Sequence, residues 1–213
     1  ITKGAPEEIL KVCTSAEIQG RVSDLTTELH DKIEAEFRDL SSKGYRVLGV
    51  SYKTLPSNKK TWTVSDECAM IFVGFAGFLD PPKQSAKKAL QQLARVGVEV
   101  KILTGDDALV TRKVCEELGF EVRGILTGAE LFDMNDDALA RVVDRINIFA
   151  RVTPAQKNRI MSLLRTHGHV VGFLGDGIND APSLRTADVG LSVNNAVDVA
   201  KEAADIILLH KSL

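Results

Sequence analysis

The chain has 213 residues, with 27 basic and 29 acidic side chains and a net charge of -2. Hydrophobic residues make up 44% of it, which is enough for one large domain or two small ones with a real core. The near balance of charge gives no electrostatic reason to expect a nucleic acid partner or an anionic membrane surface.

The first part of the chain mixes helices and strands. Helices are predicted from about Pro6 to Cys13 and across 23–43, followed by strands over 45–55 and 69–80 that a polar loop, 56–67, connects. The second strand lies in the longest apolar run, "CAMIFVGFAGFL". At 12 residues this run is well short of the roughly 20 that a membrane-spanning helix requires, so a soluble chain is expected.

Three cysteines, Cys13, Cys68 and Cys115, are far apart and lie in apolar patterns. An odd number without a CxxC spacing favours neither a disulfide framework nor a zinc site. We therefore expect buried, reduced thiols in a cytosolic environment.

A boundary is predicted at "DPPK", residues 80–83. Two adjacent prolines hold the backbone extended and remove two backbone donors, which is typical of a link between domains. The prediction is one domain over 1–79 and another over 80–213. A rigid turn within one domain is the alternative.

From Val98 onward, short apolar runs alternate with amphipathic helices. One helix is predicted over 83–96 with Gly97 as its stop, and the next ends at Gly119. Near-continuous apolar runs suit parallel strands that are buried on both faces, so the pattern predicts an α/β fold with a doubly wound, Rossmann-like sheet. Ligands of such folds bind beyond the carboxyl ends of the strands. The predicted strands are 98–105, 146–152, 169–176, 188–193 and 205–209.

The segment "GDGIND" follows the strand predicted over 169–176. Asp176 and Asp180 are hard oxygen ligands of the kind that Mg²⁺ takes, usually one or two at a time. Gly175 and Gly177 permit close approach of the backbone, and Asn179 can donate a hydrogen bond. An ordinary turn with an Asp cap is the structural alternative.

Two further polar segments lie at the ends of predicted strands. In "TGD", Thr104 supplies a hydroxyl and Gly105 an exposed amide. In "TPAQK", Thr153 and Pro154 begin a helix that carries Lys157 in its first turn. A plain turn and a solvated lysine are the structural alternatives. The order of Thr, Lys and paired Asp favours a phosphoryl-transfer site, which needs cations, amides and a divalent metal.

These residues carry a resemblance. Thr, then Lys, then "GDGxND" is similar to motifs two to four of the haloacid-dehalogenase-like superfamily, and the longer strings resemble P-type ATPases, most of all bacterial magnesium-transporting ones. The strings are "KGAPE" (3–7), "GYRVLG" (44–49), "DPPK" (80–83), "LTGDD" (103–107), "FARVTPAQK" (149–157) and "GDGINDAPSL" (175–184).

The resemblance implies roles for matching positions. Thr104, Lys157 and Asp180 would be catalytic, with Lys157 neutralising the phosphoryl group, and Asp176 would ligate Mg²⁺. Asp180 would also belong to the metal shell, and the hinge would be Asp80, Pro81 and Pro82. The implied nucleotide- and phosphate-binding residues are Lys3, Gly4, Arg46, Leu48, Gly105, Asp106, Arg151 and Asn179.

P-type ATPases phosphorylate an aspartate in "DKTGT", and this chain contains no such string. The resemblance therefore implies a fragment that begins inside a working motif at Ile1. It would hold the C-terminal part of a nucleotide-binding domain (1–79) and a phosphorylation domain without its first strand (80–213). The missing strand is expected to leave apolar edges unpaired.

The implied full-length protein is an enzyme of a bacterial inner membrane. It would couple ATP hydrolysis, through an aspartyl-phosphate, to cation transport, with magnesium the favoured ion. Its partners would be ATP, Mg²⁺ and the actuator and transmembrane domains of the same polypeptide. The fragment alone is expected neither to autophosphorylate nor to hydrolyse ATP, and to bind nucleotide weakly.

Two other functions fit part of the sequence. A soluble haloacid-dehalogenase-like phosphatase explains motifs two to four but leaves "KGAPE" and "YRVLG" without a role. A non-catalytic nucleotide- or metal-binding module could use the same pocket without a nucleophile.

Overall fold

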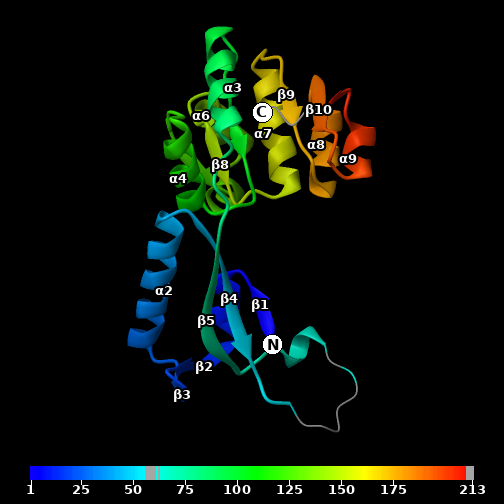
Figure 1. The fold of residues 1–213 in the computed structure, drawn as a ribbon. Coiled ribbons are helices and arrows are strands. Elements are labelled where there is room, and N and C mark those ends of the chain that lie inside the picture. The colour runs from blue at the N-terminus through cyan, green and yellow to red at the C-terminus, as the bar shows by residue number, and fades with distance from the viewer. Residues whose placement is uncertain (56–60, 62, 210–213) are drawn as a thin grey trace. The chain divides into compact units, whose positions relative to one another are not determined.

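The structure is a computed structural model that describes residues 1–213 except 56–60, 62 and 210–213. The chain divides into two compact units, Ile1–Pro81 and Pro82–Leu213, shown in Figure 1. The division falls between the two prolines of "DPPK". Much of the predicted polar loop lies outside the described residues, and its described part contains a short 3-10 helix, Val64–Asp66.

The described residues of the first unit form a five-stranded sheet with two α-helices. The strand order is β1-β4-β5-β2-β3, and α1 and α2 both contact β4. Its buried core consists of Ile9, Leu10, Cys13, Ala16, Ile33, Met70 and Phe72. The elements are β1 (Thr2–Gly4), α1 (Pro6–Val12), β2 (Cys13–Ile18), β3 (Arg21–Asp24), α2 (Thr27–Ser42), β4 (Tyr45–Tyr52) and β5 (Met70–Leu79).

The predicted start of the long helix at residue 23 is wrong. Residues Arg21–Asp24 form β3, which pairs antiparallel with β2 through a turn at Gln19 and Gly20, both with positive φ. The helix begins only after Thr26, whose hydroxyl accepts the N–H of Leu29 as a cap.

The second unit has the predicted α/β character, in shorter strands. As far as the described residues extend, these strands form two separate three-stranded sheets, β6-β8-β7 and β11-β10-β9, whose pairings are all parallel. The elements are α3 (Gln84–Arg95), β6 (Ile102–Leu103), α4 (Ala108–Leu118), β7 (Ile125–Thr127), α5 (Gly128–Asp133), α6 (Asp136–Val143), β8 (Ile148–Ala150), α7 (Pro154–Thr166), β9 (Gly172–Leu174), a 3-10 turn (Ile178–Asp180), α8 (Ala181–Thr186), β10 (Val189–Val193), α9 (Asp198–Ala203) and β11 (Ile206–Leu208).

Helix α7 serves both sheets. Its Ile160 and Leu164 pack into the core around Phe149 of β8, whereas its Met161 packs into the core around Phe173 of β9. Residues at 3- and 4-residue spacing share one face of a helix, so Met161 presents a neighbouring strip to the second sheet. This helix therefore holds the two sheets next to each other (Figure 1).

The helix stops follow the sequence prediction. Gly97 and Gly119 both have positive φ, a conformation that favours glycine, and Gly119 is the C-cap of α4. The prediction of buried thiols is wrong for Cys68, which is exposed in the segment before β5; Cys13 and Cys115 are buried. Within the described part of the chain, no helix has the length and apolar character needed to cross a membrane.

Candidate functional site

Lys157 and Asp180 form an ion pair that is largely shielded from water. Lys157 Nζ lies 2.7 Å from Asp180 Oδ1, and the two side chains are only 13% and 14% exposed. The ammonium also lies 5.9 Å from the centre of the Phe173 ring, within the range of a cation–π contact. The structural alternative of a solvated helix lysine is therefore excluded.

The start of α7 fixes the position of Lys157. The Thr153 hydroxyl accepts the Gln156 N–H at 3.3 Å, and the Gln156 side chain accepts the Thr153 N–H at 2.9 Å, a reciprocal cap. Gln156 Nε2 also donates to the carbonyl of Gly128 at 2.6 Å. Thr153 and Pro154 thus begin the helix as predicted. Gln156 was not predicted, although it helps to position the first turn of α7. A Gln three residues after a Thr is typical of a capping box and could have indicated this role.

Thr104 ties the carboxyl ends of β6 and β8 together. Its N–H donates to Phe149 O at 2.9 Å, and its carbonyl accepts the Val152 N–H at 3.0 Å. The hydroxyl oxygen accepts the Asp106 N–H at 3.0 Å, which leaves the hydroxyl hydrogen able to donate to a ligand. Gly105 between them is exposed.

Arg151 is a non-glycine residue with positive φ, a conformation that is uncommon and sterically unfavourable. Its N–H donates to Asp106 O at 3.0 Å, and its guanidinium pairs with Asp107 at 2.6 Å. Asp107 was not predicted, although it also caps α4 by accepting the Leu109 N–H. Arg151 and Asp106 are therefore joined through the backbone, as neighbours of Thr104.

Gly175 is required by the close approach of Asp180. A Cβ on Gly175 would lie 2.5 Å from the Cβ of Asp180. The backbone of Gly175 is fixed on the other side, because its N–H donates to Leu191 O at 3.1 Å and its carbonyl accepts the Ser192 hydroxyl at 2.8 Å. The predicted need for glycine is explained here by packing against a side chain.

The two carboxylates of "GDGIND" have different surroundings. Asp180 Oδ1 contacts Lys157, and Asp180 Oδ2 accepts the Gly177 N–H at 3.2 Å. Asp176 and Asn179 are exposed, and the Asp176 carbonyl accepts the Val197 N–H at 3.1 Å. Asp180 is thus engaged with protein donors, whereas the Asp176 carboxylate is open to a cation.

The donor set fits a hydrated, phosphate-bridged Mg²⁺ better than a cation enclosed by protein. No cluster of three or more His, Cys, Asp or Glu side chains suited to a metal occurs among the residues that the structure describes. Mg²⁺ typically keeps several waters and takes one or two carboxylates together with substrate phosphates. Asp176, with Asp180 nearby, can supply one or two such carboxylates.

One face of the sheet in the first unit carries three of its four predicted nucleotide-binding residues, whereas Gly4 lies on the other face. Lys3 pairs with Val50 and Gly4 with Gly49, on neighbouring antiparallel strands. Because side chains alternate along a strand and paired residues point to the same side, Lys3, Leu48 and Arg46 lie on the same face.

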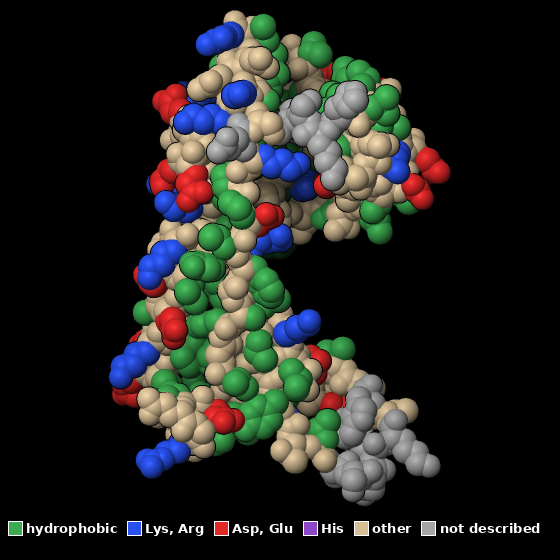
Figure 2. Space-filling view, in the orientation of Figure 1, with side chains coloured by type: hydrophobic (Ala, Val, Ile, Leu, Met, Phe, Trp, Pro, Cys, Tyr) green, Lys and Arg blue, Asp and Glu red, His purple; other side chains and the backbone are tan. Residues whose placement is uncertain are grey.

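Helix α1 covers the opposite face, since a Cβ on Gly49 would lie 3.1 Å from Ile9 Cβ. Lys3 and Arg46 are exposed and Leu48 is half-buried. Figure 2 shows hydrophobic side chains gathered over the part of this unit that holds β4 and β5. Phe78, which pairs with Arg46, is exposed.

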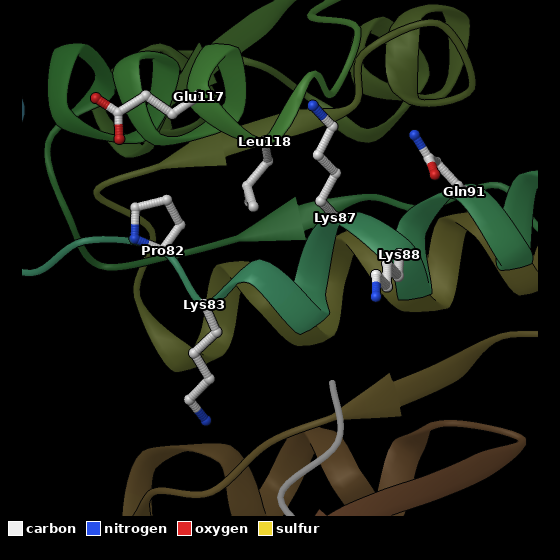
Figure 3. A pocket seen from close by; sticks show the side chains of 7 residues that line it. All are labelled: Pro82, Lys83, Lys87, Lys88, Gln91, Glu117 and Leu118. Carbon is white, nitrogen blue, oxygen red and sulfur yellow. The ribbon is translucent and has the colours of Figure 1, made fainter.

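A cavity of about 440 Å³ lies in the second unit, between the start of α3 and the end of α4. In Figure 3 the Lys87 side chain reaches toward α4, whereas Lys83 extends away from it. Its three lysines are exposed, so water competes with any ligand there. We place the functional site at the strand ends instead, because the shielded charges lie there. The cavity is lined by Pro82, Lys83, Lys87, Lys88, Gln91, Glu117 and Leu118.

The structure thus joins Lys157 directly to Asp180, and connects Thr104 to α7 through Val152. Asp176 and Asn179 follow on the same loop as Asp180. Of the predicted hinge, Asp80 and Pro81 are exposed and Pro82 is half-buried.

Parallel sheets flanked by helices, with Thr, Lys and Asp side chains beyond the strand ends, define a class of phosphate-handling enzymes. Residues 56–188 match the family described as haloacid dehalogenase-like hydrolase, and residues 1–85 match the P-type ATPase, cytoplasmic domain N. The chain belongs to the haloacid dehalogenase-like hydrolase family.

Its relatives within that family are P-type ATPases. The chain is 47% identical over 213 residues to the "Magnesium-transporting ATPase, P-type 1" of Salmonella typhimurium and to that of Escherichia coli K12, covering 100% of the chain and 24% of each relative. It is 32% identical over 208 residues to "Calcium-transporting ATPase 1" of Lactococcus lactis, again covering 24% of that protein. The chain therefore spans about a quarter of the length of these relatives.

Proposed function

We propose that residues 1–213 are the ATP-binding and phosphorylation region of a P-type cation-transporting ATPase, with magnesium as the transported ion. The observation that carries this proposal is the shielded Lys157–Asp180 pair beyond the carboxyl ends of parallel strands. A lysine held in this way keeps two N–H donors for a phosphoryl group. Electrostatic stabilisation by such fixed donors dominates phosphoryl transfer.

Each side chain has a role in this proposal. Lys157 neutralises the phosphoryl oxygens, while the Thr104 hydroxyl and the Gly105 N–H donate to them. Asp180 positions Lys157, and Asp176 holds Mg²⁺, which neutralises phosphate charge when bound. Asn179 donates to the phosphate from the same loop. An aspartate from outside residues 1–213 forms a bond to the γ-phosphorus of ATP as the bond to ADP breaks, and water then hydrolyses the acyl-phosphate.

The open sheet face of the first unit is proposed to bind the nucleotide. Lys3 and Arg46 supply positive charge for the phosphates, and Leu48 supplies apolar contact. Gly4 adjoins Lys3 on the same strand, but its Cβ position faces Ile9 of α1 and not the open face. Asp106 and Arg151 belong to the second unit and are proposed to contact the nucleotide from there. Residues 1–79 and 80–213 are then parts of the nucleotide-binding and phosphorylation domains, with Asp80, Pro81 and Pro82 as their hinge.

The length of the relatives supports a larger polypeptide. We propose that actuator and membrane domains elsewhere in the protein are its partners, that it resides in a bacterial inner membrane, and that residues 1–213 face the cytoplasm. Two relatives named as magnesium transporters are 47% identical to the chain, whereas the relative named as a calcium transporter is 32% identical. This difference favours magnesium over calcium.

A chimera tests this function. Residues 1–213 would replace the matching 24% of the Salmonella magnesium-transporting ATPase, and ATP-dependent magnesium uptake would be measured in a strain lacking its own transporters. We expect uptake by the chimera and its loss when Lys157 is replaced by Ala. A folded, membrane-inserted chimera without uptake would contradict the proposal.

The isolated chain tests the alternative of a soluble phosphatase. With p-nitrophenyl phosphate and Mg²⁺ it is expected to show no turnover, and with labelled ATP no hydroxylamine-labile phosphoprotein. Turnover by the isolated chain would favour a soluble phosphatase instead.

A further inference from the structure

Asp107 connects helix α4 to the end of strand β8 through the two oxygens of its carboxylate. Oδ1 accepts the Leu109 N–H at 2.8 Å and so caps α4, whereas Oδ2 lies 2.6 Å from the guanidinium of Arg151, the residue after β8. The Asp107 carbonyl also accepts the Thr111 hydroxyl at 2.8 Å. Because α4 packs against β8, one carboxylate that is fixed on the helix holds a side chain of the neighbouring strand end.

The backbone of Arg151 is fixed independently of this ion pair. Its N–H donates to Asp106 O at 3.0 Å, and the next N–H, that of Val152, donates to Thr104 O at 3.0 Å. On the other side, a Cβ on Gly128 would overlap the Arg151 carbonyl oxygen. These contacts hold Arg151 at a φ of 53°, which is uncommon for a residue other than glycine. Such conformations persist where the surroundings enforce them, and they cluster at ligand-binding sites.

Stability alone does not account for the ion pair. The Arg151 side chain is 42% exposed and that of Asp107 is 21% exposed, so water and salt screen the attraction between the two charges. The same exposure allows a ligand to reach the guanidinium. An arginine that is already held in one direction loses less conformational freedom when it binds such a ligand.

The shape and the place of Arg151 both suit this task. A guanidinium is planar and has five N–H donors, so one edge can bind a carboxylate while another binds a ligand oxygen. Arg151 comes two residues before Thr153, the cap of the helix that contains Lys157. Its N–H bond to Asp106 joins it to the segment that begins with Thr104. The ion pair therefore belongs to the same strand ends as the candidate site.

We propose that Asp107 is a positioning residue for nucleotide binding, which holds the Arg151 guanidinium toward the nucleotide before the nucleotide arrives. The affinity for ATP rises as a result, while the rate of phosphoryl transfer, which depends on Lys157, stays the same. The positioning follows from the contacts of Asp107, whereas its effect on ATP rests on the proposed function. The negative charge of Asp107 opposes ATP binding, but screening at this exposed pair limits that effect.

Asp107→Asn separates positioning from helix capping. Asn caps helices about as well as Asp, so the variant keeps the cap of α4 and loses the ion pair. In ATP hydrolysis by the purified chimera, we expect KM for ATP to rise about threefold and kcat to stay within about 1.5-fold. The midpoint of urea unfolding should fall for Asp107→Ala, which also loses the cap, and should stay at the wild-type value for Asp107→Asn.

A double substitution shows whether Asp107 acts through Arg151. Arg151→Gln alone should raise KM for ATP about tenfold, because a charge-assisted contact is lost. Adding Asp107→Asn to Arg151→Gln should raise KM no further, since no guanidinium remains to be held. The matched control is Asp136→Asn, which breaks another Arg–Asp pair of 2.6 Å, that with Arg159, and should change neither KM nor kcat.

NMR relaxation of the isolated chain tests the positioning without any nucleotide. The order parameter of the Arg151 Nε–H bond should lie above about 0.6 in the wild type and below it in Asp107→Asn, because lower values mark flexible groups. The Nε–H bond of Arg159, which donates to Asp136, is the internal control and should not change.

Each result decides a stated part of the proposal. An order parameter of Arg151 that Asp107→Asn leaves unchanged overturns the positioning, whatever the chimera does. An unchanged or lower KM in Asp107→Asn, or a loss of kcat instead, overturns the effect on ATP. A threefold rise in KM that persists in the Arg151→Gln background would show that Asp107 does not act through Arg151. A chimera without ATP hydrolysis contradicts the proposed function, while the order parameter still decides the positioning.

Discussion

At the scale of single residues, the candidate site depends on a lysine whose charge is kept from water. Lys157 loses hydration at its position, and Asp180 and the Phe173 ring compensate for that loss. Because both charges are shielded, removing one partner leaves the other poorly solvated.

Replacing Lys157 by Met is expected to destabilise the chain by about 3 kcal/mol, since Asp180 would keep only the Gly177 N–H as a partner. Urea unfolding measures the change. The matched control is Lys113→Met, which breaks an exposed pair with Glu117 and should cost only a few tenths of a kcal/mol. Adding Asp180→Asn to Lys157→Met should recover part of the loss, as expected for coupled neighbours. Equal effects of the two lysine substitutions would contradict a shielded pair.

The two glycines of "GDGIND" provide a second test. Gly175→Ala should destabilise the chain by about 2 kcal/mol, because its Cβ would overlap that of Asp180. Gly177→Ala is the control: its Cβ would meet Asp180 Oδ2 at 3.4 Å, an ordinary contact. The midpoints of urea denaturation of both variants decide this, and a larger loss for Gly177→Ala would be incompatible with the described turn.

At the scale of elements, an acidic side chain links α6 to α7. Asp144, the C-cap of α6, lies 2.9 Å from His167 Nδ1 and 3.0 Å from His169 Nε2, both just after α7. The hydrogen bond from His167 lowers the pKa of Asp144; partial burial opposes this, and His169 adds to the lowering.

Asp144→Asn is expected to reduce stability by less than about 1 kcal/mol, because the carboxylate is 47% exposed. A lowered pKa in the folded state stabilises the fold above the unfolded value of about 3.9, and this contribution is lost as the pH falls through the folded pKa. The difference between wild type and variant should therefore be present at pH 5.5 and shrink toward pH 3. Urea titrations at both pH values measure it, with the exposed Asp133→Asn as control. A difference that grows on acidification would show that Asp144 is not the linked group.

Sequence periodicity predicted long amphipathic helices well and strand edges poorly. The helix around Val110 ends at Gly119 as expected, because a glycine just after the last apolar position readily adopts the left-handed conformation of a C-cap. The sequence analysis did not predict β7, α5 and α6, because segments of three to eight residues are too short to show the apolar periodicity of a helix or of a strand. The hairpin at Gln19 was missed because its strand residues Arg21–Asp24 are exposed and carry no apolar alternation.

The site was predictable only in part for a related reason. Lys157 and Asp180 were singled out by their types and places at strand ends. Their direct contact, and the different surroundings of Asp176 and Asp180, depend on how residues 23 positions apart meet in space. The Arg151–Asp107 pair, 44 positions apart, was missed for the same reason.

At the scale of the whole molecule, each compact unit has a core of its own. The first is built around Ile9, Met70 and Phe72, and the second around Phe149 and Phe173. A unit with its own buried core is expected to fold alone. This holds even though the two prolines of "DPPK" were the one sequence feature that indicated the boundary between the units.

Residues 1–81 and 82–213, expressed separately, should therefore each show a cooperative urea transition, and their far-ultraviolet circular dichroism should sum to that of the whole chain. The effect of Lys157→Met should be the same, within about 0.5 kcal/mol, in residues 82–213 and in the whole chain, because sites without shared partners add. If residues 82–213 alone bound the dye ANS and lacked a cooperative transition, the expectation that this unit folds independently would be contradicted.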